Sequence, residues 1–132
     1  GCKDDTLNEN MSRCLFGLPR AHLDTVKRVG ERTALFLFNY DTRKMYGVFA
    51  ASGPGGLNLE PEAFVNHKKG AAYPGSPFPA QLRFRVVFKG SPLSEHLWRH
   101  LPTVKSGRKG GPPQYDYWMS GEKARAMANL FK

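Results

Sequence analysis

The chain has 132 residues, which is enough for one domain with its own core and too few for two ordinary ones. Hydrophobic residues make up 40% and charged residues 23%, a balance that excludes a disordered polar chain. The net charge of +9 favours an anionic partner such as nucleic acid, an acidic protein segment or an anionic membrane surface.

Two helices are predicted in the N-terminal part. Thr6-Leu7-Asn8-Glu9 has the pattern of a capping box, with Thr6 as the N-cap. Apolar residues follow at helical spacing, at Leu7, Met11, Cys14 and Leu15, so Cys14 is expected to be a buried free thiol. Gly17 and Pro19 should end this helix. A second, short helix is expected over residues 21–29.

Strands are predicted in the middle of the chain. Residues 33–38 are continuously apolar and β-prone, which indicates a central strand buried on both faces. Residues 39–42 form a turn, and residues 45–51 form the returning strand. A long irregular stretch, 57–79, comes next. Residues 82–89 then alternate between apolar and mostly basic side chains, as in a half-buried strand with a basic outer face.

The C-terminal part is predicted to mix helix, loop and strand. A helix opens with Pro92 at its first position. Residues 105–113 form a basic, Gly- and Pro-rich loop that is expected to be flexible. An aromatic strand over 115–119 and a last helix capped by Ser120 complete the chain. This order of elements favours a single α+β domain over a doubly wound α/β fold.

No catalytic, metal or cofactor motif is found. His96 and His100 have a spacing that can bind metal on a helix, but no third ligand is evident. Gly53-Pro54-Gly55-Gly56 lacks the Lys-Ser/Thr of a phosphate-binding loop. No run of about 18 apolar residues could span a membrane. We therefore expect a binding domain that is neither an enzyme nor a membrane protein.

A basic surface with nearby tyrosines is the candidate site. Arg and Lys side chains hold phosphates and tyrosine rings stack on bases, so RNA or another polyanion is the predicted ligand. In the alternative interpretation the tyrosines border the core and the basic strand face is only solvated. A further cluster is formed by His67, Lys68 and Lys69. The candidate nucleic-acid-binding residues are Arg83, Arg85, Lys89, Lys105, Arg108, Lys109, Tyr40 and Tyr46.

Five ordered blocks, at residues 15–19, 35–42, 47–51, 55–64 and 79–83, resemble the DCD (development and cell death) domain family. The residues that carry the resemblance, in structural or binding roles, are Phe16, Gly17, Leu18, Pro19, Asn39, Gly47, Phe49, Gly55, Gly56, Asn58, Pro61, Pro79 and Gln81. The chain departs from the family pattern at Phe64, where tryptophan is usual. Only Gly1-Cys2 could remain of the family's N-terminal strand, so a truncated strand is expected.

The resemblance implies a plant or algal binding module in stress or cell-death pathways, forming part of a longer protein. It also implies a small PUA-like or YTH-like mixed β-barrel or curved sheet flanked by short helices, since the family pattern is distantly similar to those RNA-binding domains. The alternative function is a protein-interaction module with a groove for a partner peptide. The two cysteines do not suggest a disulfide, which favours the cytoplasm or nucleus.

Overall fold

The first helix begins and ends at different residues from those predicted. In the computed structural model, which describes residues 1–65, 75–105 and 110–132, α1 spans Asp4–Arg13 with Lys3 as its N-cap. The Thr6 hydroxyl accepts the Lys3 N–H at 3.2 Å from within the helix, so the predicted cap at Thr6 is wrong. Cys14 ends the helix in the left-handed conformation (φ 51°). Its thiol is exposed rather than buried, and the buried thiol belongs to Cys2.

A short strand, β1 (Leu15–Leu18), follows α1 where only a helix end was expected. It pairs antiparallel with β5 (Ala80–Val86) in a register that places Leu15 opposite Arg83. Leu15 is fully buried. Its side chain continues the helical pattern in the sequence, but in the structure it packs with Ala63 and Phe64. β5 itself ends at Val86, three residues earlier than the predicted strand.

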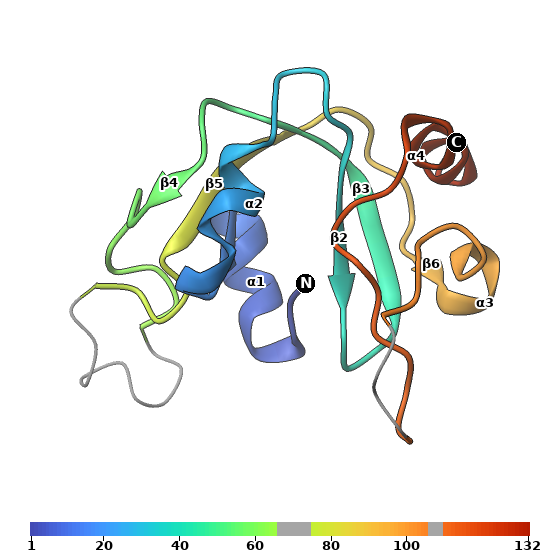
Figure 1. Ribbon diagram of the computed structural model, residues 1–132, viewed down its shortest axis with the longest axis horizontal. Helices are drawn as coiled ribbons and strands as arrows, with labels where there is room; N and C mark the ends of the chain where they lie inside the picture. Colours follow the sequence, from blue (N-terminus) through green and yellow to red (C-terminus); the bar gives the residue numbers. More distant parts are fainter. Residues whose placement is uncertain (66–74, 106–109) are drawn as a thin grey trace.

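The sheet is built around the predicted hairpin of β2 (Leu35–Asn39) and β3 (Lys44–Ala51). The strand order is β1-β5-β3-β2, and Figure 1 shows β2 and β3 side by side. Two short strands complete it: β4 (Gly56–Leu57) pairs with β5, and β6 (Leu93–Ser94) pairs with β3. The α+β class is confirmed. The described strands form an open antiparallel sheet, and the PUA-like or YTH-like barrel is not confirmed.

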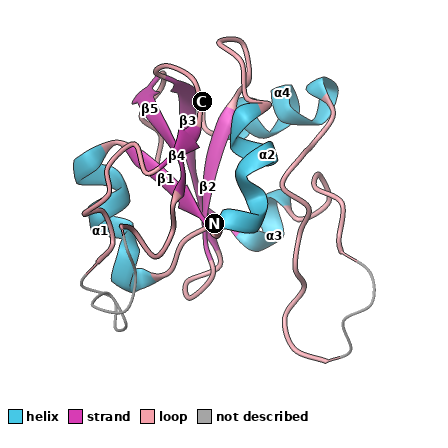
Figure 2. Ribbon diagram, turned by 60° about the vertical axis from the view of Figure 1, so that its left-hand side comes forward, coloured by secondary structure: helices cyan, strands magenta, loops and turns pink. Residues whose placement is uncertain are grey.

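Short helices flank the sheet (Figure 2). The 3-10 helix η1 (Arg20–His22) and α2 (Leu23–Lys27) replace the single helix predicted over 21–29, beginning one residue earlier and ending two residues earlier. α3 (Glu95–Trp98) begins after β6 instead of at Pro92, because Leu93 and Ser94 pair with β3. None of the helices in the described ranges is long and apolar enough to cross a membrane.

The C-terminal segment confirms one prediction and corrects another. α4 (Gly121–Leu130) begins after Ser120, whose hydroxyl accepts the Lys123 N–H at 3.3 Å, as the sequence predicted. Residues 115–119 were predicted as a strand, but among the described residues only Tyr115 makes a single bridge, to Val104. The segment therefore packs through its side chains rather than through a β-ladder.

The core lies on both faces of β2, as the continuous apolar run predicted. Phe38 packs with Trp98, Met127 and Phe131 beneath α3 and α4. The adjacent Leu37 belongs to the opposite cluster, which includes Cys2, Phe49 and Phe84. Phe16 stacks on Phe84 with ring centroids 4.4 Å apart and so joins β1 to this second cluster.

The N-terminal residues extend the sheet beside β2. Cys2 forms a parallel bridge with Asn39, in which the Cys2 N–H donates to the Phe38 carbonyl and the Tyr40 N–H donates to the Cys2 carbonyl, both at 2.8 Å. This is the position where the family resemblance implied an N-terminal strand. Burial raises the pKa of the Cys2 thiol to about 11, so it stays protonated at neutral pH.

Candidate functional site

The basic outer face of β5 contains a mixed charge network. Arg83 and Arg85 are both exposed, as predicted, but the Arg83 Nε lies 3.6 Å from the Glu60 carboxylate, and its Nη2 donates to the Leu59 carbonyl at 3.1 Å. Arg13 binds the same Glu60 at 2.7 Å and Glu9 at 2.8 Å. Two carboxylates therefore offset much of the positive charge at this end of the strand.

The remaining predicted site residues that the structure describes belong to several elements rather than to β5 alone. Tyr46 is half-buried and packs against the cluster of Leu37 and Phe49. The Lys105 ammonium lies 4.9 Å from the centre of the Tyr117 ring, and the Lys105 N–H donates to the Gln114 carbonyl. Lys89 and Arg85 are exposed and pair with none of the described acids. Arg108, Lys109 and the His67–Lys69 cluster lie outside the described residues.

A concave surface with tyrosines does exist, at another place. A groove with a volume of about 520 Å³ lies between β2 on one side and β1 with α2 on the other, and residues 115–128 form its third wall. Its lining is mainly apolar, including Phe16, Leu35 and Phe36. Tyr40, Tyr117 and Trp118 add aromatic surface. At the groove, the free edge of β2 pairs with Cys2 through its bridge to Asn39. No other residue in the described part of the chain pairs with this edge.

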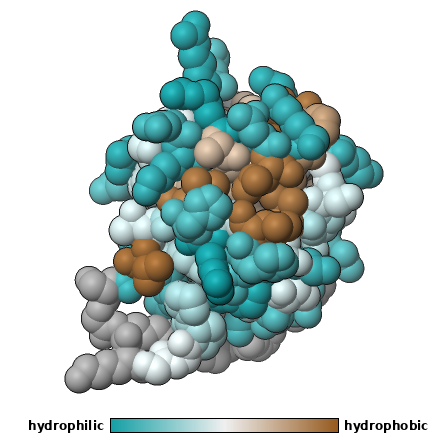
Figure 3. All heavy atoms as spheres, turned by 90° about the vertical axis from the view of Figure 1, so that its right-hand side faces the viewer, coloured by the Kyte–Doolittle hydropathy of each residue, from teal (hydrophilic) through white to brown (hydrophobic). Residues whose placement is uncertain are grey.

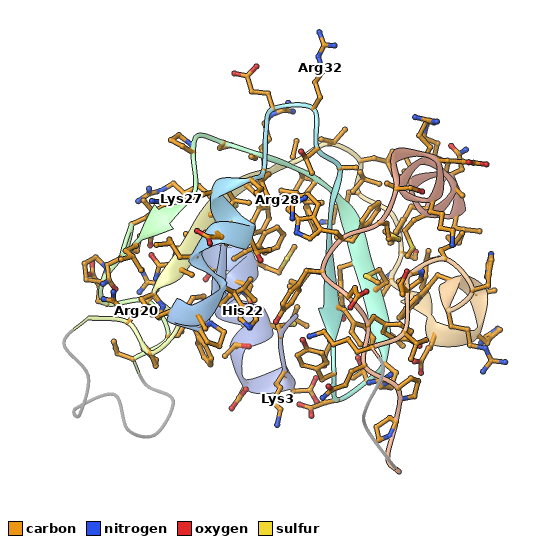
Figure 4. The ribbon with its side chains drawn as sticks, in the orientation of Figure 1. Lys3, Arg20, His22, Lys27, Arg28 and Arg32 are labelled. Atoms are coloured by element: carbon orange, nitrogen blue, oxygen red, sulfur yellow. The ribbon has the colours of Figure 1, made fainter. Side chains whose placement is uncertain are left out.

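We call six exposed or half-buried basic residues of the segment 3–32 the basic ridge; of the six, Arg32 lines the groove itself. Its members lie on the start of α1, on η1 and α2, and in the loop before β2 (Figure 4). None of them forms an ion pair with an acid in the described part of the chain, although Asp24 and Glu31 belong to the same stretch. The ridge consists of Lys3, Arg20, His22, Lys27, Arg28 and Arg32.

The ridge is joined to the aromatic wall of the groove. The Arg28 guanidinium lies 4.2 Å from the centre of the Trp118 ring, and the His22 ring meets Tyr117 edge-on at 4.9 Å. A cation over the face of an aromatic ring is attracted to the ring, so the Arg28–Trp118 contact stabilises both side chains in place. Sequence reasoning missed this ridge, although Arg20, Lys27, Arg28 and Arg32 fall within thirteen residues of one another.

The groove tyrosines are uncharged over the physiological pH range. Burial, followed by the nearby Tyr117, raises the pKa of Tyr40 to about 12. Burial also raises the pKa of Tyr117. Both residues are nevertheless about two-fifths exposed, at 40% and 39%. Neutral aromatic surface therefore lies open beside unpaired cations, an arrangement that suits stacking combined with phosphate contacts.

Several family-motif residues hold the fold together. The Asn39 amide is fully buried, donating to Asp4 and accepting the Asp41 N–H, both at 2.8 Å. Gln81 is equally buried and accepts the Glu60 N–H at 2.7 Å, which anchors the loop after β4. A side chain on Gly17 would lie 2.6 Å from the Phe64 ring. These positions are structural in the described part of the chain.

No metal-binding arrangement is seen in residues 1–65, 75–105 and 110–132, where no three His, Cys, Asp or Glu side chains converge. Glu95 forms an ion pair with Arg43 at 2.6 Å, and its oxygens also accept the Tyr115 hydroxyl. The Arg43 guanidinium, followed by the Tyr115 hydroxyl, lowers the pKa of Glu95. This charge cluster ties the β2–β3 turn, α3 and the segment around Tyr115 together.

Comparison with known proteins gives the chain its family. The model of the development and cell death domain matches residues 1–131. The DCD domain-containing protein NRP-B of Glycine max is 40% identical over 131 residues, covering 98% of this chain and 37% of that protein. The B2 protein of Daucus carota is 40% identical over 100 residues, covering 76% of this chain and 47% of that protein.

The Arabidopsis thaliana DCD domain-containing protein NRP is also 40% identical, over 101 residues that cover 76% of this chain and 28% of that protein. The chain thus spans between about a quarter and a half of these relatives. No solved structure matches it. The full-length family match and the plant relatives confirm the resemblance carried by the five sequence blocks, and the chain belongs to the development and cell death (DCD) domain family.

Proposed function

We propose that this DCD domain is a non-catalytic module that binds a polyanion, RNA in the first place, along the basic ridge. The observation that supports it most is the set of unpaired cations on and around α2, next to the exposed rings of Tyr40 and Tyr117. Phosphates would contact the cations, and bases would stack on the rings. We infer that it acts in the cytoplasm or nucleus, within plant development and cell-death pathways.

The ridge is preferred to the β5 face because of their different acid neighbours. Arg83 on β5 shares Glu60 with Arg13, whereas Arg20 and Lys27 on the ridge have no carboxylate partner among the described residues. A phosphate approaching Arg83 would be repelled by the Glu60 carboxylate. In the described part of the chain, no carboxylate lies within ion-pair distance of Arg20 or Lys27.

The test is fluorescence anisotropy with labelled single-stranded RNA. Replacing Arg20 and Lys27 with glutamate removes two ridge cations and leaves the Arg28–Trp118 and His22–Tyr117 contacts in place. We expect affinity to fall about tenfold or more. A matched control, Arg99→Glu with Lys123→Glu, changes the net charge equally at exposed positions elsewhere and should have a much smaller effect.

Two kinds of result would contradict binding of RNA by the ridge. No binding at low salt, or affinity that salt does not weaken, would rule out a phosphate-based interface. Equal losses in the two double variants would show that only the overall charge matters. Binding of RNA would then be nonspecific attraction to the whole surface rather than recognition by the ridge.

Protein interaction is the second candidate, and the groove supports it. Main-chain bonds between Cys2 and β2 show that an extended segment can pair in parallel with this edge. Beyond Cys2, the edge along Leu35–Leu37 faces an apolar groove. The fitting ligand is an extended apolar segment of a partner protein, added to β2 as a further strand.

Trp118 lines the groove and provides the readout for that candidate. Titration with a short Val- and Thr-rich peptide should shift the tryptophan emission, and Trp118→Phe should abolish the shift. The core tryptophan, Trp98, is fully buried and serves as an internal reference. An unchanged emission spectrum at millimolar peptide, or displacement of bound RNA without any Trp118 response, would count against a peptide groove.

A further inference from the structure

An exposed apolar segment lies where β5 leaves the sheet. Val86, Val87 and Phe88 are 46%, 54% and 39% exposed, although the preceding Leu82 and Phe84 are almost completely buried. The segment is nevertheless fixed to the core. The Val48 carbonyl accepts the Val87 N–H at 2.8 Å and the Phe88 N–H at 3.2 Å, and the Val48 N–H donates to the Phe88 carbonyl at 2.8 Å.

Two helices contribute to the same face. Gly90 packs so closely against Phe131 that a side chain on it would lie 2.8 Å from the Phe131 carbonyl, which places this segment beside the end of α4. Leu130 of α4 and Leu97 of α3 are 39% and 44% exposed. Figure 3 shows apolar side chains gathered on this face and bordered by hydrophilic ones. We call Val86, Val87, Phe88, Leu97 and Leu130 the apolar patch.

The border of the apolar patch is positively charged. Lys89 follows Phe88 directly, Arg99 is the C-cap of α3, and Lys132 lies just beyond α4; all three are exposed. The acid of α3, Glu95, is neutralised by Arg43. Only Glu122, in the first turn of α4, adds an exposed negative charge to these two helices.

We propose that the apolar patch docks an acidic amphipathic helix of a partner protein. Apolar side chains at i, i+3, i+4 and i+7 of such a helix would cover the patch, and its acidic flanks would meet Lys89, Arg99 and Lys132. The patch is held by main-chain bonds, so little ordering is needed on docking. A second copy of this chain is a poor occupant, because symmetric pairing would bring two cationic borders together.

A designed peptide tests this proposal without knowledge of the natural partner. The probe has about 18 residues, with leucines at i, i+3, i+4 and i+7 and glutamates elsewhere. Titrated into the ¹⁵N-labelled domain, it should shift the amide resonances of residues 86–90, Leu97 and Leu130. Val87→Glu with Leu97→Glu should weaken binding at least about tenfold. Val104 is 53% exposed and forms its bridge with Tyr115 rather than with a patch segment, so Val104→Glu should bind as the unaltered domain does.

Four outcomes would overturn the proposal. These are no binding at millimolar peptide, equal binding of a shuffled peptide, equal losses from Val104→Glu, and binding of phosphatidylserine vesicles through the patch in place of the peptide. The result is independent of RNA binding by the basic ridge. Val87→Glu with Leu97→Glu should retain RNA affinity, so the failure of one proposal can be told from the failure of the other.

Discussion

At the residue scale, the motif glycines of the family differ in what they are needed for. The Gly55 backbone runs against Val26 of α2 so closely that a side chain on it would clash with the Val26 carbonyl group, lying 2.7 Å from its carbon. The next residue, Gly56, has its nearest neighbour at 3.4 Å, the flexible end of Leu59. Neither glycine has a positive φ, so the two differ only in how much room their surroundings leave for a side chain.

This difference predicts opposite behaviour for the two glycines. Gly55→Ala should lower the free energy of unfolding by about 1–3 kcal/mol, because backbone atoms cannot yield to the added methyl group. Gly56→Ala should change it by less than about 1 kcal/mol, since the contact is ordinary and the unfolded chain loses entropy. Urea denaturation of both variants measures the difference. Equal midpoints would show that the loop shifts freely from α2.

At the element scale, one ion pair joins the β2–β3 turn, α3 and the segment before Tyr115. The Arg43 Nη2 donates to Glu95 at 2.6 Å and to the Pro113 carbonyl at 2.7 Å, while Tyr115 donates to the same Glu95. Glu95→Gln keeps the shape but loses the charge, and should cost about 2 kcal/mol of stability at neutral pH. Glu122→Gln, at an exposed position, should cost little.

The stabilisation by Glu95 should depend on pH with a definite sign. Its pKa is lowered in the folded state, so the unfolded state binds the proton more readily. The contribution is complete above the ordinary glutamate pKa and disappears as the pH falls through the lower, folded value. The stability difference between the unaltered domain and Glu95→Gln should therefore shrink in acid. A difference that is constant down to acid pH would mean that the charge contributes nothing.

Local pattern predicts the central elements but not the sheet edges. The hairpin of β2 and β3 was predicted because a long apolar run leaves little choice but burial on both faces. β1 was missed because Gly17 and Pro19 mark a helix end, and pairing with Ala80–Arg83 depends on residues far along the chain. The aromatic segment 115–119 was predicted as a strand from β propensity, yet its rings contact Arg28 and His22 instead of a neighbouring strand.

At the scale of the whole molecule, the sequence predicts the sign of the charge but not its location. Arg83 and Arg85 seemed to begin a basic face because the alternation of β5 shows which side chains share a side. The alternation cannot show that Glu60, in a loop 23 positions earlier, comes within 3.6 Å of the Arg83 Nε in the folded domain. The basic ridge was missed for a different reason, since its cations do not alternate along one strand but are distributed over the start of α1, η1, α2 and the loop before β2.

Salt dependence distinguishes a local ridge from a diffuse field of net charge +9. Each phosphate that a cation neutralises on a single strand adds about 0.7 to the slope of log Kd against log salt concentration. Four contacts on the ridge would give a slope of about 3, and Arg20→Glu with Lys27→Glu should reduce it by about 1.4. Arg85→Glu with Lys89→Glu removes as much charge from the β5 side and should leave the slope unchanged. A variant lowers the slope only if the cations it removes were neutralising phosphates. Equal decreases in the two double variants would therefore show that the phosphates also contact the β5 side and are not confined to the ridge.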